Sequence, residues 1–113
     1  MSDTAAVAAV LVSTTVDSET AAVAIATEVV TDRLAACVQV IGPMTSVYRW
    51  QGQVEQAREW ACQMKTTTAR LDLLTTRLRR LHPYQVPEIL VVPILTADPA
   101  YLSWLAESVA PEA

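Results

Sequence analysis

The stretch TSVYRWQGQVEQAREWACQMKTT, residues 45–67, decides the fold. It contains two strand-like runs joined by Gln51-Gly52, and a two-residue loop with glycine in second position favours the type I′ turn of a β-hairpin. The first run starts before this stretch, with a strand-like segment at 34–41 that Gly42-Pro43 interrupts. Such a break indicates a bulge or sharp bend within one strand. The second run predicts one long strand over 53–67.

Before the hairpin, the sequence predicts one strand and one helix. Residues 7–13 are apolar and rich in valine, which is typical of a buried strand, and 14–17 follow as a turn. A helix is expected over 19–33, with Ser18 as its N-cap. Its buried stripe, read from helical spacing, is Ala22, Ile25, Ala26, Val29 and Val30.

After the hairpin, we expect a helix over 69–81 with Thr68 as its N-cap, a loop over 82–87 that two prolines make rigid, and a strand over 88–94. A short helix opens at Asp98-Pro99. The expected inward side chains of these two helices are Leu71, Leu74 and Leu78 in the first, and Tyr101, Leu102, Trp104 and Leu105 in the second.

The order strand, helix, strand, strand, helix, strand is that of a split βαβ unit, so we predict an α+β, ferredoxin-like fold. Both central helices then pack on one face of a four-stranded antiparallel sheet, and the other face stays open. With 113 residues, the chain suits a single domain over 1–113.

Composition excludes several classes of protein. Apolar residues make up 52% of the chain and the formal net charge is −4. An acidic chain lacks the basic face that neutralises nucleic-acid phosphates, and the arginines at 77, 79 and 80 are expected to be a solvated helix end. No apolar run reaches the roughly 20 residues that span a bilayer. The N-terminus lacks the basic start of a secretory signal, so the sequence predicts a cytoplasmic protein without nucleic-acid or membrane partners.

The scarce residue types exclude specific sites. Two glycines are too few for a Walker A loop or a GxGxxG fingerprint. One histidine excludes a His-rich zinc site within one chain, and two cysteines without CxxC spacing argue against a disulfide scaffold.

Strand alternation sorts the side chains of the hairpin onto two faces. Trp60, Cys62 and Met64 share the face that should meet the helices, so Cys62 is interpreted as a packing residue. The open face collects a polar set: Cys37, Gln39, Gln63 and Lys65, the last being the only lysine in the chain.

The two hairpin strands are too long for so small a domain, at about 15 residues each against a usual 5–6. Their far end carries Tyr48 and Trp50, and projecting aromatic rings with unpaired edges invite a partner chain. We infer a homo-oligomer in which the ribbon of one subunit lies against the next. The alternative is an overhang capped by the chain's own C-terminal helix.

Five ordered motifs resemble one family over residues 8 to 105. They are RLAACV (33–38), YRWQG (48–52), KTT (65–67), HPYQVPEI (82–89) and YLSWL (101–105). These motifs are similar to those of the CutA family, the divalent-cation tolerance proteins. The resemblance implies a ferredoxin-like subunit in a tight, PII-like homotrimer, a cytoplasmic setting, and a link to tolerance of copper and other divalent metals. It implies no enzymatic reaction.

The resemblance also implies copper ligands, namely a cysteine near the end of the first strand and a histidine pair before the Pro-Tyr motif. This chain has Ser13 and Leu81 at two of those positions, and only His82 remains. Cys37 is a thiolate candidate for a soft metal such as Cu(I). His82 and Cys37 are therefore the candidate metal ligands. The alternatives are a histidine that helps to cap the helix before it, and a half-buried interface cysteine.

A cleft between subunits is the second candidate site. Lys65, Glu59 and Glu88 could form a charged cluster there, and the lysine would attract an anionic effector. The simpler explanation, which we favour, is an interface salt bridge. Tyr84 and Trp50 are the expected aromatic residues of the cleft, although Trp50 is better explained as an anchor for the neighbouring subunit.

Two functions follow from these candidates. The first is a divalent-cation tolerance protein that binds or responds to metal ions, copper above all, at the subunit clefts of a trimer. The second is a PII-like signalling trimer that binds a small anionic effector or a partner protein. A hydrolase that uses Glu59, Lys65 or Glu88 would lack an activated nucleophile with an adjacent base, so no enzyme is expected.

Overall fold

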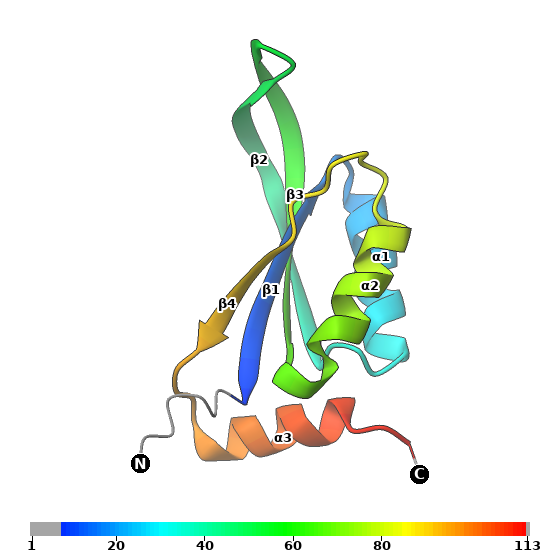
Figure 1. Ribbon diagram of the computed structural model, residues 1–113, viewed down its shortest axis with the longest axis vertical. Helices are drawn as coiled ribbons and strands as arrows, with labels where there is room; N and C mark the ends of the chain where they lie inside the picture. The colour runs from blue at the N-terminus through cyan, green and yellow to red at the C-terminus, as the bar shows by residue number, and fades with distance from the viewer. Residues whose placement is uncertain (1–7, 113) are drawn as a thin grey trace.

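The structure, a computed structural model, describes residues 8–112 as one sheet with helices on it (Figure 1). The strands follow the order β2-β3-β1-β4, and each neighbouring pair is antiparallel. The elements are β1 (Ala9–Val16), α1 (Glu19–Thr31), β2 (Cys37–Trp50), β3 (Gln53–Thr67), α2 (Leu71–Leu81), β4 (Leu90–Ile94) and α3 (Pro99–Val109). This order and pairing confirm the ferredoxin-like fold that the sequence predicts.

The main core lies between the sheet and the two helices α1 and α2, which lie side by side on one face (Figure 1). Alternate residues of β1 and β3 point into it, and so do the inward positions of the helices. Its fully buried members include Val12, Val16, Val29, Cys62, Met64, Leu74 and Leu78. Val30, which the sequence places in the buried stripe of α1, is instead exposed, because only the side of α1 with Ala22, Ile25 and Val29 is packed into the core.

Only some of the helix ends lie where the sequence predicts them. Ser18 caps α1, since its Oγ accepts the Ala21 N–H at 3.0 Å. Thr68 does not cap α2, because a 3-10 turn over Thr68–Arg70 comes first and α2 begins at Leu71. The first helix ends two residues before 33, because Arg33 adopts a left-handed backbone with φ of 60°.

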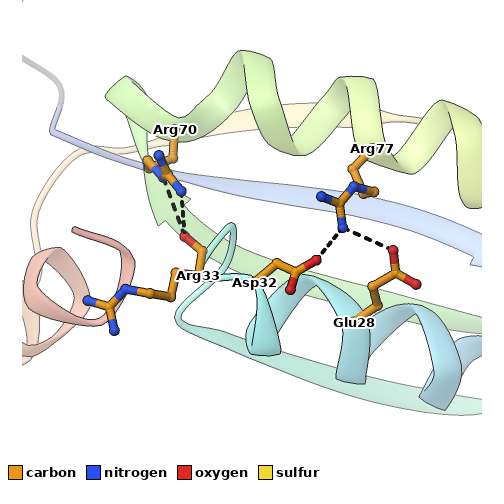
Figure 2. A network of polar contacts seen from close by, with 5 residues as sticks. All are labelled: Glu28, Asp32, Arg33, Arg70 and Arg77. Atoms are coloured by element: carbon orange, nitrogen blue, oxygen red, sulfur yellow. Dashed lines mark hydrogen bonds and ion pairs between the residues drawn. The ribbon is translucent and has the colours of Figure 1, made fainter. Parts of the chain in front are cut away.

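Arginine side chains tie the helices together around that left-handed residue (Figure 2). The Arg33 guanidinium donates to the carbonyls of Ala110, at 2.7 Å, and Glu107, at 2.8 Å, at the C-terminal end of α3. Arg70 donates to the Arg33 carbonyl at 3.3 and 3.4 Å. Between α1 and α2, Arg77 pairs with Glu28 at 3.0 Å and Asp32 at 2.6 Å, so this arginine is an ion-pair partner rather than only a solvated helix end.

The hairpin forms as predicted. Gln51 and Gly52 both have positive φ, 50° and 81°, as a type I′ turn requires. The pairing of β2 with β3 shifts register between Ile41 and Met44, which confirms the irregularity expected at Gly42-Pro43. A side chain at Gly42 would meet the Trp60 ring at 2.6 Å, so the bulge depends on glycine there.

The hairpin also overhangs the rest of the sheet. Strand β1 ends where Val16 pairs with Trp60, so within the described residues 53–59 pair only with β2. Helix α3 lies across the opposite end of the sheet, where Leu105 and Val109 pack on Ala9 and Ala36 (Figure 1). The overhang is therefore not capped by the C-terminal helix of its own chain.

Three further expectations are wrong. Strand β1 continues through 14–16, because Thr14 and Val16 extend the alternation of buried side chains where a turn was expected. Strand β4 starts at Leu90, two residues later than predicted. Tyr101 and Trp104 are exposed, because Leu105 and Val109 form the buried side of α3. Within residues 8–112, no helix combines the length and the apolar character needed to span a membrane.

Candidate functional site

A cleft of about 670 Å³ lies where the overhang, the end of β1 and the loop after α2 meet. This volume is typical of a small-ligand site. The overhang, the end of β1 and the β1–α1 turn contribute Thr15, Asp17, Ser46, Val47, Tyr48, Trp50, Glu55, Ala57 and Glu59, and the loop contributes Tyr84, Gln85, Val86 and Glu88. Four residues that the sequence marks for a cleft, Trp50, Glu59, Tyr84 and Glu88, thus line the same space.

One hydrogen bond joins the loop to β3 inside this cleft. The Tyr84 hydroxyl donates to Glu59 Oε2 at 2.7 Å. The Glu59 side chain is only 7% exposed, so this hydroxyl satisfies a carboxylate that would otherwise be costly to bury. Burial, the hydrogen bond to Glu59 and the charge of Glu59 raise the pKa of Tyr84 above its ordinary value, so the phenol stays protonated at neutral pH.

His82 lies directly behind the loop and is 8% exposed. Its Nε2–H donates to the Thr15 carbonyl at 2.9 Å, and its Nδ1 accepts the backbone N–H of Tyr84 at 3.1 Å. Because a carbonyl only accepts and an N–H only donates, the ring is neutral with its proton on Nε2. Burial lowers the pKa of His82, which favours the same neutral form. A metal could reach a ring nitrogen only after one of these bonds breaks.

The cleft is acidic. Asp17, Glu55, Glu59 and Glu88 are among its lining residues, and that lining contains no lysine, arginine or histidine of residues 8–112. Carboxylates gathered in a partly enclosed space attract cations and repel anions. Asp17 and Glu55 were not predicted as cleft residues from the sequence. Glu55 could have been found, because it pairs with Tyr48 across the predicted turn.

Lys65 lies outside this cleft, so the expected charged cluster with Glu59 and Glu88 does not form within the chain. It is six residues from Glu59 along β3, or about 20 Å at the rise of a strand. Its ammonium donates to Gln39 Oε1, and Gln39 Nε2 donates to Cys37 Sγ at 3.5 Å. Cys37, Gln39 and Lys65 thus share the face turned away from α1 and α2, as alternation predicts, but α3 covers one end of that face, where it packs on Ala9 and Ala36.

The two candidate metal ligands also lie far apart. Cys37 pairs with Lys65, whereas His82 bonds to Thr15, which pairs with Ala61 nearer the hairpin. Across residues 8–112, no three histidine, cysteine or acidic side chains are close enough to hold a metal ion within one chain. Cys62 is a core residue, as expected, and burial raises its pKa to about 11.

Comparison with known proteins identifies similar chains. The family model described as CutA1 divalent ion tolerance protein matches residues 10–108. The divalent-cation tolerance protein CutA of Thermus thermophilus is 47% identical over 94 residues, which cover 83% of this chain and 91% of that protein. The CutA1 crystal structure from Oryza sativa has a TM-score of 0.89 at 34% identity and covers 94% of this chain and 97% of that one. A structure from Archaeoglobus fulgidus, described as a periplasmic divalent cation tolerance protein CutA, has a TM-score of 0.86 at 30% identity, with 89% of this chain and 98% of that chain covered.

Proposed function

Since this chain belongs to the CutA1 divalent ion tolerance family, we propose that it binds or responds to metal ions, copper among them, at the acidic cleft of a homotrimer. The role is binding rather than catalysis. The observation that carries the proposal is the set of four carboxylates around one cleft, with no basic residue of 8–112 in its lining.

The chemistry of the cleft supports a cation as its ligand. Carboxylate oxygens suit hard divalent cations, and Cu²⁺ accepts oxygen donors together with nitrogen. The copper ligands that the family resemblance implies do not fit this chain, because Ser13 and Leu81 occupy two of those positions and both His82 nitrogens are hydrogen-bonded. Glu59 and Glu88 are therefore the ligands that we propose.

A homotrimer would explain why one chain alone does not gather three metal-ligating groups among the described residues. The overhang exposes Val47, Tyr48, Trp50 and Val54, and the edge strand β4 with the residue after it exposes Leu90, Val91, Val92 and Leu95. Exposed apolar side chains beside unpaired strand edges favour contact with another chain. We propose that neighbouring subunits cover the overhang and complete the coordination at the cleft.

The second hypothesis, a PII-like trimer that binds a small anionic effector, has less support. The cleft is acidic, and Lys65, the residue expected to attract an anion, is at the other end of β3 and bonded to Gln39. The same separation removes the cluster on which a hydrolase would depend. The cytoplasmic location also stays a proposal, since the Archaeoglobus fulgidus relative is described as periplasmic.

Calorimetric titration with Cu²⁺ and, separately, with Ca²⁺ at pH 7.5 tests the proposal. We expect Glu59→Gln combined with Glu88→Gln to weaken cation binding at least tenfold, because both changes remove charge and keep the side-chain shape. Glu107→Gln on α3 and Cys37→Ser are the controls and should bind as the wild type does. Light scattering should give three times the 12.3 kDa of the chain.

Three outcomes would count against the proposal. Loss of copper binding in Cys37→Ser, with the double variant unchanged, would move the site to the open face. Binding of a small anion such as citrate, without any bound cation, would favour the signalling hypothesis. A monomeric mass would remove the argument that a neighbour completes the site.

A further inference from the structure

Glu59 is a buried carboxylate whose charge the described part of the chain does not balance. Its side chain is only 7% exposed, and the Tyr84 hydroxyl binds one of its two oxygens, Oε2. Within residues 8–112, both ion pairs belong to Arg77, and no hydrogen bond reaches Glu59 Oε1. A buried charge without a counter-charge is costly. Because Glu59 lines the cleft, a cation that enters the cleft would remove this cost.

A second carboxylate lies farther along the same side of the hairpin. Glu55 and Glu59 both line the cleft and are four residues apart on β3. The pairing with β2 is regular over this stretch, so their Cα atoms are about 13 Å apart at the rise of a strand. Two positive charges held apart by a chain suit this spacing better than one compact ion.

The floor between the two carboxylates consists of small side chains. Ala57 is the residue between them on that side of β3, and it pairs with Ser46 of β2. Both of these residues line the cleft. A thin methylene chain can lie on such a floor, whereas a larger side chain at either position would fill the space.

Aromatic rings form much of the remaining wall. Tyr48, which pairs with Glu55, lines the cleft together with Trp50 and Tyr84. Aromatic faces attract ammonium groups, and their edges and faces cover methylene groups from water. The volume of about 670 Å³ is also that of a site for a small organic molecule and not for a single ion.

We propose that this cleft binds a linear aliphatic oligoamine, with one ammonium group on Glu59 and another on Glu55. The first ammonium donates to Glu59 Oε1, and the methylene chain lies over Ala57. No basic side chain of residues 8–112 lines the cleft to repel such a ligand. This ligand class goes beyond the function proposed above, because it adds an organic cation to the metal ions and requires no metal.

Calorimetric titration of the full-length protein with spermidine, in metal-free buffer at pH 7.5, tests the proposal. Hexaamminecobalt(III) is the comparison ligand, because it carries the same positive charge without a methylene chain. We expect spermidine to bind about tenfold more tightly, since burial of two methylene groups already contributes this much. Equal affinity for the two ligands would show that charge alone attracts them, and it would overturn the proposal.

A charge variant tests the second carboxylate. We expect Glu55→Gln to weaken spermidine binding about tenfold, because it removes one charged hydrogen-bond acceptor. Glu107→Gln, which removes the same charge on α3, is the matched control and should bind spermidine as the wild type does. Equal weakening in the two variants would mean that only the net charge of the protein matters, and it would contradict the proposal.

A shape variant tests the floor without any change of charge. Ala57→Leu fills the space between the carboxylates, so we expect it to weaken spermidine binding about tenfold. Gln56→Leu adds an apolar side chain at the neighbouring position of β3, which points to the other face, and should have little effect. Unchanged spermidine binding in Ala57→Leu would overturn the proposed path of the chain.

Titration of the same proteins with Ca²⁺ separates this proposal from the proposed function. Spermidine binding without any binding of Ca²⁺ or Cu²⁺ would sink the proposed function and leave the oligoamine site standing. Metal binding without spermidine binding would do the reverse. If spermidine did not bind and Glu59→Gln changed the mass of the assembly, another subunit would supply the counter-charge of Glu59, and the oligoamine proposal would be wrong.

Discussion

The two halves of β3 differ in what covers them. From Trp60 to the end at Thr67, the strand lies between β2 and β1 beneath two helices, and Cys62 and Met64 are fully buried. Before Trp60 the same strand pairs only with β2, and Val54 is 67% exposed. The covered half provides the stability of the subunit. The uncovered half, which only β2 of its own chain supports, provides Glu55, Ala57 and Glu59 to the cleft wall.

The largest expected effect is on the covered half. Leu74 is fully buried on α2, and its neighbour Leu73 is 53% exposed on the other side of the same helix. We expect Leu74→Ala to lower the free energy of unfolding by about 2–5 kcal/mol, because it leaves a cavity. Leu73→Ala should change it by less than about 0.5 kcal/mol. Denaturant unfolding at one protein concentration measures both.

Equal losses in the two leucine variants would contradict this division of the molecule. They would show that the outer side of α2 is covered as well, so that the helices rather than the overhang meet another chain. Val54→Ala tests the uncovered half in the same way. If another subunit covers the overhang, this change should shift the assembly equilibrium more than the stability of the subunit.

A smaller effect is expected at the end of α3. Arg33→Ala removes two charged hydrogen bonds to α3 carbonyls and leaves the backbone in a left-handed conformation that alanine does not favour. We expect a loss of about 1–2 kcal/mol, since hydrogen bonds from charged groups contribute this much or more and these are partly exposed. Hydrogen exchange should speed up mainly in α3.

Two control variants sharpen this prediction. Arg33→Gly loses the same bonds but relieves the backbone, so it should cost less than Arg33→Ala. Arg79→Ala, on the exposed side of α2, should have almost no effect. If Arg33→Ala weakened α1 rather than α3, the left-handed turn and not the guanidinium would be the important feature.

The sequence predicted the covered half better than the cleft. The alternation of β3, the helical spacing of Leu74 and Leu78, and the Gln51-Gly52 turn are local patterns, and the structure confirms them. Strand β1 was predicted too short, because a threonine followed by valine and aspartate resembles a turn when the pairing with β3 is unknown. Strand β1 extends to Val16 because its residues pair with β3, which is distant in sequence, and not because of their local propensity.

The cleft could be predicted only in part because it joins four segments that are distant in sequence. Glu59 and Glu88 were marked, but Lys65 was placed with them because alternation gives the face of a strand and not the distance along it. Asp17 was placed only in the turn before the first helix, and nothing local shows that it lines the cleft with the loop. The two hydrogen bonds of His82 depend on β1 and the loop meeting, so its position behind the cleft required the structure.

The smallest expected effect is at the tip of the overhang. Gly52 has a φ of 81° and open space around its Cα, so Gly52→Ala adds only backbone strain, about 1 kcal/mol. Because the overhang is paired only within itself in this chain, we expect the strain to appear as local opening. Amides beside the turn should exchange about fivefold faster. The amide of Met64, in the covered half, should exchange at its wild-type rate. A matching acceleration at Met64 would mean that the two halves of β3 unfold together, and that the division at Trp60 is one of burial and not of stability.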